Sequence, residues 1–265
     1  MAKINLTIAD GLAVIELNDP PANTYSYEMM QEIDAAVLEA RMDAATHVIV
    51  LRGAGDKFFC AGANIGMLKD ADPDFKYYFC LHANETLTRL EQTPKLVIAA
   101  LNGHTVGGGL EVALAADLRI ARRGAGKIGL PEVALGVLPG TGGTQRLARL
   151  VGKARAIELM ATGRLMTMDE ALPLGIVTEV WGDEELQARS FNDAVLDYAR
   201  QFTPPAKASR AVGRMKRAVQ SGAEAGMLEG LSIERELQQL LFQSDDAREG
   251  IAANLEKRKP QFQGK

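Results

Sequence analysis

Two glutamates, each isolated in a long uncharged stretch, are the residues of this 265-residue chain best suited to chemistry. Glu111 is the only charged residue in segment 105–116, and Glu132 is the only one in segment 128–145. A buried carboxylate without a cation nearby must find a distant partner, remain protonated or perform a function. Two such carboxylates close in space would suit general acid–base catalysis.

A run of three glycines precedes the first of these glutamates. Gly107, Gly108 and Gly109 are expected between a strand and a helix. Because Glu111 follows Gly108 by three residues, both should lie at the same end and on the same face of that helix. Glycines let a ligand approach the backbone and leave N–H groups free at a helix N-terminus. Such groups stabilise a developing oxyanion, and losing one typically costs about 10²–10³ in rate. The alternative is tight helix packing, with Glu111 interacting only with the helix dipole.

A second loop of small residues follows the strand predicted at 47–51. It reads F-F-C-A-G-A-N over residues 58–64, at the strand end where α/β sheets bind ligands. The backbone N–H of Ala63 could converge there with that of Gly108. The alternative is an ordinary turn from a strand into a helix.

Two further glycine-rich segments imitate nucleotide-binding motifs. Residues 139–144 (P-G-T-G-G-T) lack the G-K-[ST] ending of a phosphate loop, so we expect them to form the wall beside Glu132 and to cap a helix near Gln145. Residues 124–129 match G-x-G-x-x-G, but Pro131 follows too soon for a dinucleotide-binding helix. This segment predicts a surface turn.

Composition and residue spacing argue against several classes of function. A net charge of −4 argues against broad nucleic-acid binding. Cys60 and Cys80 have no zinc or redox spacing and indicate free thiols in a reducing compartment. His82 and His104 have no metal-ligand partners at readable spacing, so no metal site is predicted. Without a signal-peptide layout or a membrane-length apolar run, the expected location is the cytoplasm, with no membrane partner.

Apolar periodicity alternates between strands and helices, which predicts an α/β fold. The expected strands are 4–8, 12–17, 47–51, 95–101 and 118–121, and the expected helices are 26–40, 74–91 and 110–116. We expect a core over residues 1–200 and a helical C-terminal module over residues 201–265, whose apolar faces pack on the core or on another subunit. The basic run between Lys207 and Arg217 predicts a solvated helix face, where one or two cations could hold a phosphate.

Four segments together closely resemble the enoyl-CoA hydratase (crotonase) family. They are F-C-A-G-A-N at 59–64, N-G-H-T-V-G-G-G-L-E at 102–111, the eighteen-residue segment at 130–147 and E-K-R-K-P-Q-F at 256–262. The resemblance covers nearly the whole chain in order. It implies a spiral of repeated ββα units and a helical C-terminal trimerisation module that forms a trimer or a hexamer. It also implies a role in fatty acid metabolism such as β-oxidation.

The resemblance also implies roles for particular residues. Ala63 and Gly108 correspond to the two oxyanion N–H donors of the family, and Glu111 and Glu132 correspond to the two catalytic glutamates of its hydratases. The implied reaction is reversible addition of water across the 2,3 double bond of a 2-enoyl-CoA. We expect Glu111 to activate water and Glu132 to protonate C2. No separate cofactor is expected, because coenzyme A is part of the substrate.

Departures from the family pattern concern substrate binding. Asn64 and Gly66 replace an aspartate and a lysine that are common there, so a CoA phosphate contact is expected elsewhere, for example at Lys57. Tyr25 replaces a small or aliphatic residue and is expected to touch the acyl pocket. The full set of expected substrate-binding residues is Tyr25, Lys57, Ala61, Asn64, Ile65, Gly107, Leu130, Pro131 and Gly140.

Other reactions on the same scaffold remain open at this point. An enoyl-CoA isomerase and a biosynthetic acyl-thioester dehydratase would use similar residues. Some relatives bind RNA, but that function favours a basic first helix, and here segment 28–41 is acidic.

Overall fold

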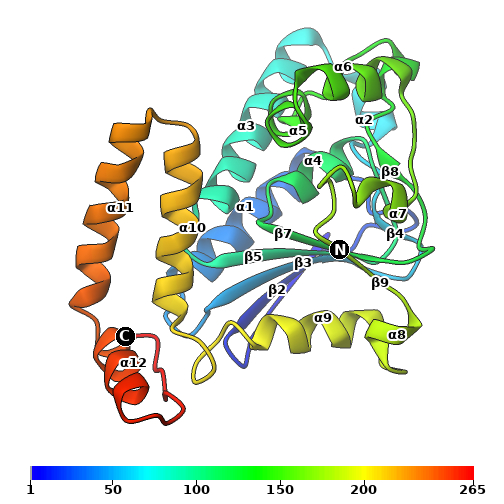
Figure 1. Cartoon of the computed structure of the whole chain (residues 1–265). Coiled ribbons are helices and arrows are strands. Elements are labelled where there is room, and N and C mark those ends of the chain that lie inside the picture. The colour runs from blue at the N-terminus through cyan, green and yellow to red at the C-terminus, as the bar shows by residue number, and fades with distance from the viewer. Residues whose placement is uncertain (1) are drawn as a thin grey trace.

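The computed structural model describes residues 2–265, which form two parallel-rich sheets wrapped by helices (Figure 1). The strands are β1 (Ile4–Ala9), β2 (Leu12–Leu17), β3 (Val48–Gly53), β4 (Phe58–Cys60), β5 (Leu96–Leu101), β6 (His104–Val106), β7 (Leu118–Arg122), β8 (Ile128–Gly129) and β9 (Glu179–Trp181). The helices of the first half are α1 (Tyr27–Met42), α2 (Ile65–Asp70), α3 (Pro73–Gln92) and α4 (Gly108–Leu114), and the short 3₁₀ helix η1 (Glu132–Leu135) follows β8. The second half contains α5 (Gly143–Val151), α6 (Lys153–Thr162), α7 (Met168–Ala171), α8 (Asp183–Leu186), α9 (Phe191–Arg200), α10 (Ser209–Ala223), α11 (Met227–Phe242) and α12 (Asp245–Leu255).

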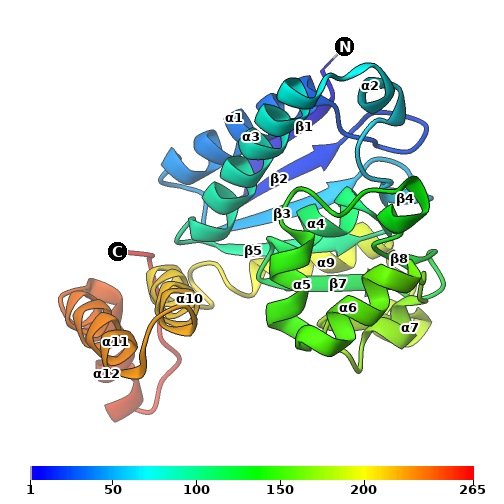
Figure 2. The same ribbon diagram turned by 90° about the horizontal axis from the view of Figure 1, so that it is seen from above.

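The larger sheet has the order β1-β2-β3-β5-β7-β9 and is parallel except for the β1–β2 hairpin. Its central strands are apolar on both faces because helices cover both sides. Ile49 and Leu51 face the cluster that includes α1, α3 and α4, whereas Val48 and Val50 face α9. Figures 1 and 2 show α1 and α3 on one side of this sheet and α9 on the other.

The smaller sheet has three parallel strands in the order β4-β6-β8. Each of them follows directly on a strand of the larger sheet, so the pairs β3–β4, β5–β6 and β7–β8 step from one sheet to the other. A helical segment follows each pair, namely α2 with α3, α4 and η1. The chain therefore repeats a ββα unit in structure although its sequence shows no repeat.

Most long elements agree with the sequence prediction. The side chain of Ser26 caps α1 by accepting from the N–H of Met29, as the expected helix start required. The strands at 58–60, 104–106 and 128–129 lie in segments that the sequence predicted as loop or turn, and the last of them corrects the surface turn expected at 124–129. Helix α5 begins at Gly143, two residues before the predicted helix start near Gln145.

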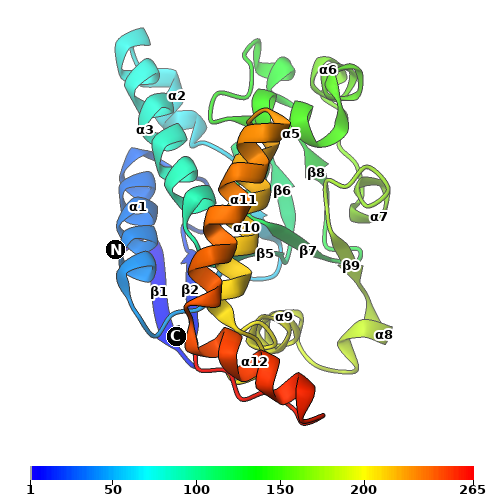
Figure 3. The same ribbon diagram turned by 60° about the vertical axis from the view of Figure 1, so that its left-hand side comes forward.

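The C-terminal helices stand at one side of the core, where α10 and α11 form an antiparallel pair and α12 folds back beneath them (Figure 3). Helix α10 is anchored by Lys216, whose Nζ lies 2.9 Å from Asp117 Oδ2 and donates to the carbonyl oxygen of Lys95 at 3.0 Å. Lys216 is buried, so the prediction of a fully solvated basic face was wrong at this position. Gly213 explains the burial, because a side chain there would overlap the backbone of Pro94 and keep α10 away from the sheet.

Within residues 2–265 no helix is both long enough and apolar enough to cross a lipid bilayer.

Candidate active site

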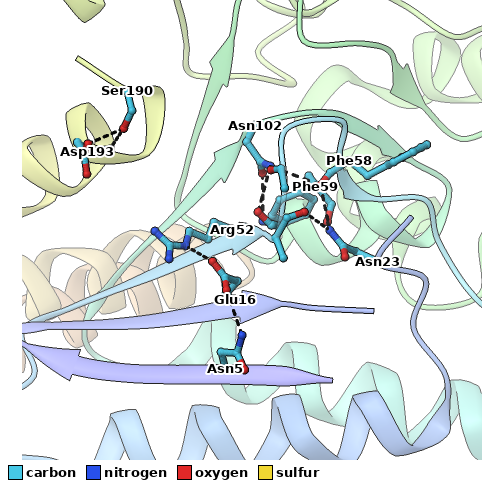
Figure 4. Close-up of polar contacts among 12 residues, drawn as sticks. Asn5, Glu16, Asn23, Arg52, Phe58, Phe59, Asn102, Ser190 and Asp193 are labelled. Carbon is cyan, nitrogen blue, oxygen red and sulfur yellow. Dashed lines mark hydrogen bonds and ion pairs between the residues drawn. The ribbon is translucent and has the colours of Figure 1, made fainter. Parts of the chain in front are cut away.

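Two buried asparagines fix the loop that enters the smaller sheet. Asn23 Nδ2 donates to the carbonyl oxygens of Ala54 and Phe58 at 3.0 and 3.1 Å, and Asn102 Nδ2 donates to that of Gly55 at 2.7 Å. Asn102 also exchanges two hydrogen bonds with the backbone of Gly53. Figure 4 shows both amides turned onto this loop from either side. Because the loop leads directly into β4, these contacts set the position of the residues that follow Cys60.

Beyond β4 the backbone of Tyr25 pairs with that of Ala63 in a parallel bridge. The N–H of Tyr25 donates to Gly62 O at 3.0 Å, and the N–H of Asn64 donates to Tyr25 O at 2.9 Å. The carbonyl of Gly62 and the N–H of Asn64 are therefore both hydrogen-bonded to Tyr25, whereas the N–H of Ala63 points away from Tyr25. Gly62 has φ +88°, and a Cβ added there would lie only 3.1 Å from the amide nitrogen of Gly108.

Gly108 is the first residue of α4, so its N–H has no partner within that helix. Neither this N–H nor that of Ala63 makes a hydrogen bond to the rest of residues 2–265. Both residues line one cavity of about 280 Å³. Two unpaired backbone donors that converge on a cavity form the arrangement that binds an oxyanion.

Glu111 lies one turn into α4 and is almost completely buried. Its Oε1 accepts the N–H groups of Thr141 and Gly143 at 2.8 and 2.7 Å, and its Oε2 accepts the hydroxyl of Thr141. Burial raises the pKa of Glu111, whereas these hydrogen bonds and the charge of Arg146 act in the opposite direction. The distant partners that the sequence required are thus neutral donors from the loop before α5.

Glu132 has a different environment. It begins η1, and its Oε2 is buried without a hydrogen-bond partner among residues 2–265. The pKa of Glu132 is raised to about 7, first by burial and to a smaller extent by the nearby charge of Glu111. Gly107 makes room for this carboxyl, because a Cβ at that position would lie 3.1 Å from Glu132 Oε1.

The cavity brings together most of the residues that the sequence predicted. Its wall includes Tyr25, Ala61, Ala63, Ile65, Gly107, Gly108, Glu111, Pro131, Glu132 and Gly140. Both carboxylates and both N–H donors therefore face the same space. The rest of the wall is mainly apolar and includes Leu68, Phe79, Leu135 and Leu138, and Lys76 is the only cation among the lining residues.

Three expected binding residues lie outside this wall. The ammonium of Lys57 lies 5.5 Å from the ring centroid of Phe58. The side chain of Asn64 caps α2 by accepting from the N–H of Met67 at 3.0 Å. Leu130 is buried in the main core. The structure gives these three residues packing or capping contacts.

Thr141 is the residue at this site that sequence reasoning missed. We expected segment 139–144 to form the wall beside Glu132, and Gly140 and Thr141 do line the cavity, but the carboxylate held by this loop is Glu111. Gly143 must lack a side chain, because a Cβ there would lie 2.9 Å from Glu111 Oε1. The only sequence signal was the position of Thr141 between glycines in an uncharged loop.

Comparison with known proteins identifies the group to which this architecture belongs. Residues 7–265 match the family Enoyl-CoA hydratase/isomerase. An enoyl-CoA hydratase structure from Geobacillus kaustophilus HTA426 superposes with a TM-score of 0.94 at 45% identity, over 100% of this chain and 98% of that one. The chain therefore belongs to the enoyl-CoA hydratase/isomerase family and has the crotonase fold.

Curated relatives agree over nearly the whole length. The crotonyl-CoA hydratase of Syntrophomonas wolfei is 37% identical over 254 residues, which cover 95% of this chain and 94% of that protein. The short-chain-enoyl-CoA hydratase of Clostridium acetobutylicum is 36% identical over 249 residues, which cover 94% and 92%.

Proposed function

We propose that this enzyme is an enoyl-CoA hydratase, a hydro-lyase that reversibly adds water across the 2,3 double bond of a 2-enoyl-CoA to give a 3-hydroxyacyl-CoA. The observation that carries this proposal is the convergence of two carboxylates and two unpaired backbone N–H groups on one largely apolar cavity. Membership of the family and the hydratase names of its relatives support it.

The two N–H groups would bind the thioester carbonyl oxygen. Addition at C3 moves electron density onto that oxygen, so donors aimed at it stabilise the transition state more than the ground state. We assign this role to Ala63 and Gly108. Their amide groups are held by the backbone of Tyr25 and by the start of α4, and therefore need little reorganisation during the reaction.

The unequal environments of the carboxyls support a division of labour. Burial raises the pKa of Glu111, but the three hydrogen bonds that it accepts oppose this effect and stabilise its ionised form, which suits a base that takes a proton from water. Glu132 has a pKa of about 7 and an unpaired buried oxygen, which suits an acid that delivers a proton to C2. Pairs of carboxyls whose surroundings differ in this way commonly separate into a base and an acid.

The reaction requires no cofactor besides the coenzyme A of the substrate, because water addition next to a thioester carbonyl is complete with a base, an acid and an oxyanion site. Among residues 2–265, no three His, Cys, Asp or Glu side chains cluster in a way that would hold a metal ion. We propose that the enzyme acts without a metal.

We further propose that residues 201–265 mediate self-association into a trimer or a hexamer. Helix α11 has no buried residue in the single chain, and its apolar side chains include Met227, Leu228 and Phe242, which are 78%, 76% and 60% exposed. Such a helix face is normally covered in the working protein. Analytical ultracentrifugation measures the assembly directly.

We also propose a cytoplasmic location, which the free thiols Cys60 and Cys80 support.

The test of the activity is the loss of conjugated-thioester absorbance when purified enzyme meets short, medium, branched and aromatic 2-enoyl-CoA thioesters. We expect loss of absorbance with at least one of them and a product heavier by one water molecule. A product of unchanged mass with a shifted double bond would identify an isomerase instead. No absorbance loss and no product with any thioester would refute the proposal.

A further inference from the structure

The hydroxyl of Tyr25 lies beside the reaction site without belonging to the four groups assigned above. Tyr25 is 2% exposed, and its Oη lies 3.1 Å from Thr141 Oγ1. Thr141 Oγ1 in turn contacts Glu111 Oε2. Tyr25, Thr141 and Glu111 thus form a continuous chain of hydrogen bonds between three segments that are far apart in sequence.

The direction of these hydrogen bonds follows from the chemistry of the groups. An ionised carboxylate only accepts, so Thr141 must donate its single hydroxyl proton to Glu111. The oxygen of Thr141 is then free to accept from Tyr25, which must be the donor. Burial, and next the charge of Glu111, hold the pKa of Tyr25 well above its usual value, so its hydroxyl keeps its proton.

If these hydrogen bonds ran in the opposite direction, from Glu111 to Thr141 to Tyr25, one hydroxyl proton would lack an acceptor. If Glu111 carried the proton, it would donate to Thr141, and Thr141 would donate to Tyr25. The proton of Tyr25 would then need another acceptor, but within residues 2–265 its hydroxyl has only Thr141 as a partner. Among residues 2–265, both hydroxyl protons have an acceptor only when Glu111 is ionised.

We propose that Tyr25 and Thr141 are positioning residues that keep Glu111 ionised and aim its carboxylate into the cavity for water activation. This inference rests on the proposed function and adds two residues to it. The surrounding backbone is shaped for the contact. A Cβ on Gly108 would overlap the Tyr25 hydroxyl, so glycine at 108 serves both the unpaired N–H and the access of Tyr25 to Thr141.

Four substitutions separate this role from simple packing. T141V removes the hydroxyl and keeps the side-chain shape, and T141S restores the hydroxyl. Y25F removes only the donor to Thr141. The matched control is T86V, because Thr86 is also fully buried but its hydroxyl has no hydrogen-bond partner among residues 2–265.

The readout is the pH profile of kcat/KM with the thioester that the wild-type enzyme hydrates fastest. Loss of a hydrogen bond to a charged group should move the acidic limb of T141V upward by about one to two pH units. On that limb kcat/KM would fall about tenfold per unit. Y25F should move it in the same direction by about half a unit, because it acts through Thr141. T141S and T86V should follow the wild-type profile.

A second readout does not depend on activity. In protein carrying ¹³C-labelled glutamate side chains, the carboxyl signal of Glu111 is assigned by its loss in E111Q and titrated by NMR. T141V should raise the titration midpoint by about one to two units, and T141S should not. An active wild-type enzyme whose acidic limb and Glu111 titration are both unmoved in T141V and Y25F would overturn the positioning role alone. An inactive wild-type enzyme with the expected NMR shift would overturn the hydratase function and leave the network standing.

Discussion

Helix α4 has a carboxylate near each end, one buried and one largely buried, and the two are held in opposite ways. Near its start, Glu111 accepts only from neutral groups, the two N–H donors and the hydroxyl of the 139–144 loop. Just beyond its end, Asp117 pairs with the ammonium of Lys216 at 2.9 Å and also accepts from Val97 and Gln220. Burial raises the pKa of both carboxyls.

The difference separates a carboxylate that holds two structural elements together from one that is placed to exchange a proton. A buried ion pair fixes two elements against each other, because removing either partner leaves an uncompensated charge. Neutral donors orient a carboxylate without neutralising its charge, so it can still exchange a proton with a bound ligand. Asp117 accordingly joins α10 to the sheet, whereas Glu111 faces the cavity.

The largest expected effect is on turnover at the Glu111 end. E111Q keeps the shape of the side chain but removes the proposed base, so kcat should fall by about 10²–10⁴-fold. The melting temperature should change little, because an amide can still accept the two loop N–H groups. Steady-state kinetics and calorimetry on the same preparation test both statements, and a strongly destabilised E111Q with normal turnover per folded site would reverse the comparison.

The next effect is on stability at the Asp117 end. K216M leaves Asp117 buried without its cation, which should lower the unfolding free energy by about 3–5 kcal/mol. Turnover per folded active site should be retained. The double variant D117N/K216M should recover part of the loss, because no buried charge then remains unpaired. Urea unfolding of the three proteins measures this, and a K216M variant as stable as wild type would show that the pair does not anchor α10.

A smaller effect should follow from crowding the loop that holds Glu111. G143A would place a Cβ 2.9 Å from Glu111 Oε1 and 2.8 Å from Pro139 Cβ. We expect the loop to shift and kcat to fall about tenfold, the cost of losing one hydrogen bond to a charged group. G222A is the matched control, because its Cβ would meet only ordinary contact at 3.7 Å. Equal kinetics for the two variants would contradict the role of Gly143.

The smallest effect concerns Glu132, which has neither a cation nor a full set of donors. Its folded pKa of about 7 exceeds its ordinary value of 4.5, so the native protein holds a proton that the unfolded chain releases between these values. The free energy of unfolding therefore falls as pH rises through that window. E132Q cannot lose this proton and should melt above the wild type at pH 8 by about 2–4 °C, on the order of 1 kcal/mol after allowance for partial exposure. At pH 5 the two proteins should melt together, and a difference that persists there would exclude the titration of Glu132 as its cause.

Much of this architecture could be predicted from local sequence. The apolar runs at 48–51 and 96–101 mark buried strands, and the isolation of Glu111 and Glu132 marks both carboxyls that the cavity contains. The strands of the smaller sheet were missed because two or three residues are too few to show a period. Their pairing depends on neighbours elsewhere in the chain.

Contacts between distant segments could not be predicted from the sequence either. Thr141 meets Glu111 thirty positions away, and nothing in either segment specifies the other. Lys216 lies in a basic run typical of a solvated helix face. Its burial depends on how closely Gly213 lets α10 approach Pro94, which is a property of tertiary packing.

The four-residue turn η1 has one more consequence. Glu132, the proposed proton donor, lies in this turn, and one of its carboxyl oxygens has no hydrogen-bond partner among residues 2–265. Exchange of this single residue would leave the amide pair, Glu111 and both sheets in place. We therefore expect that substitution of Glu132 alone could give this fold a different reaction.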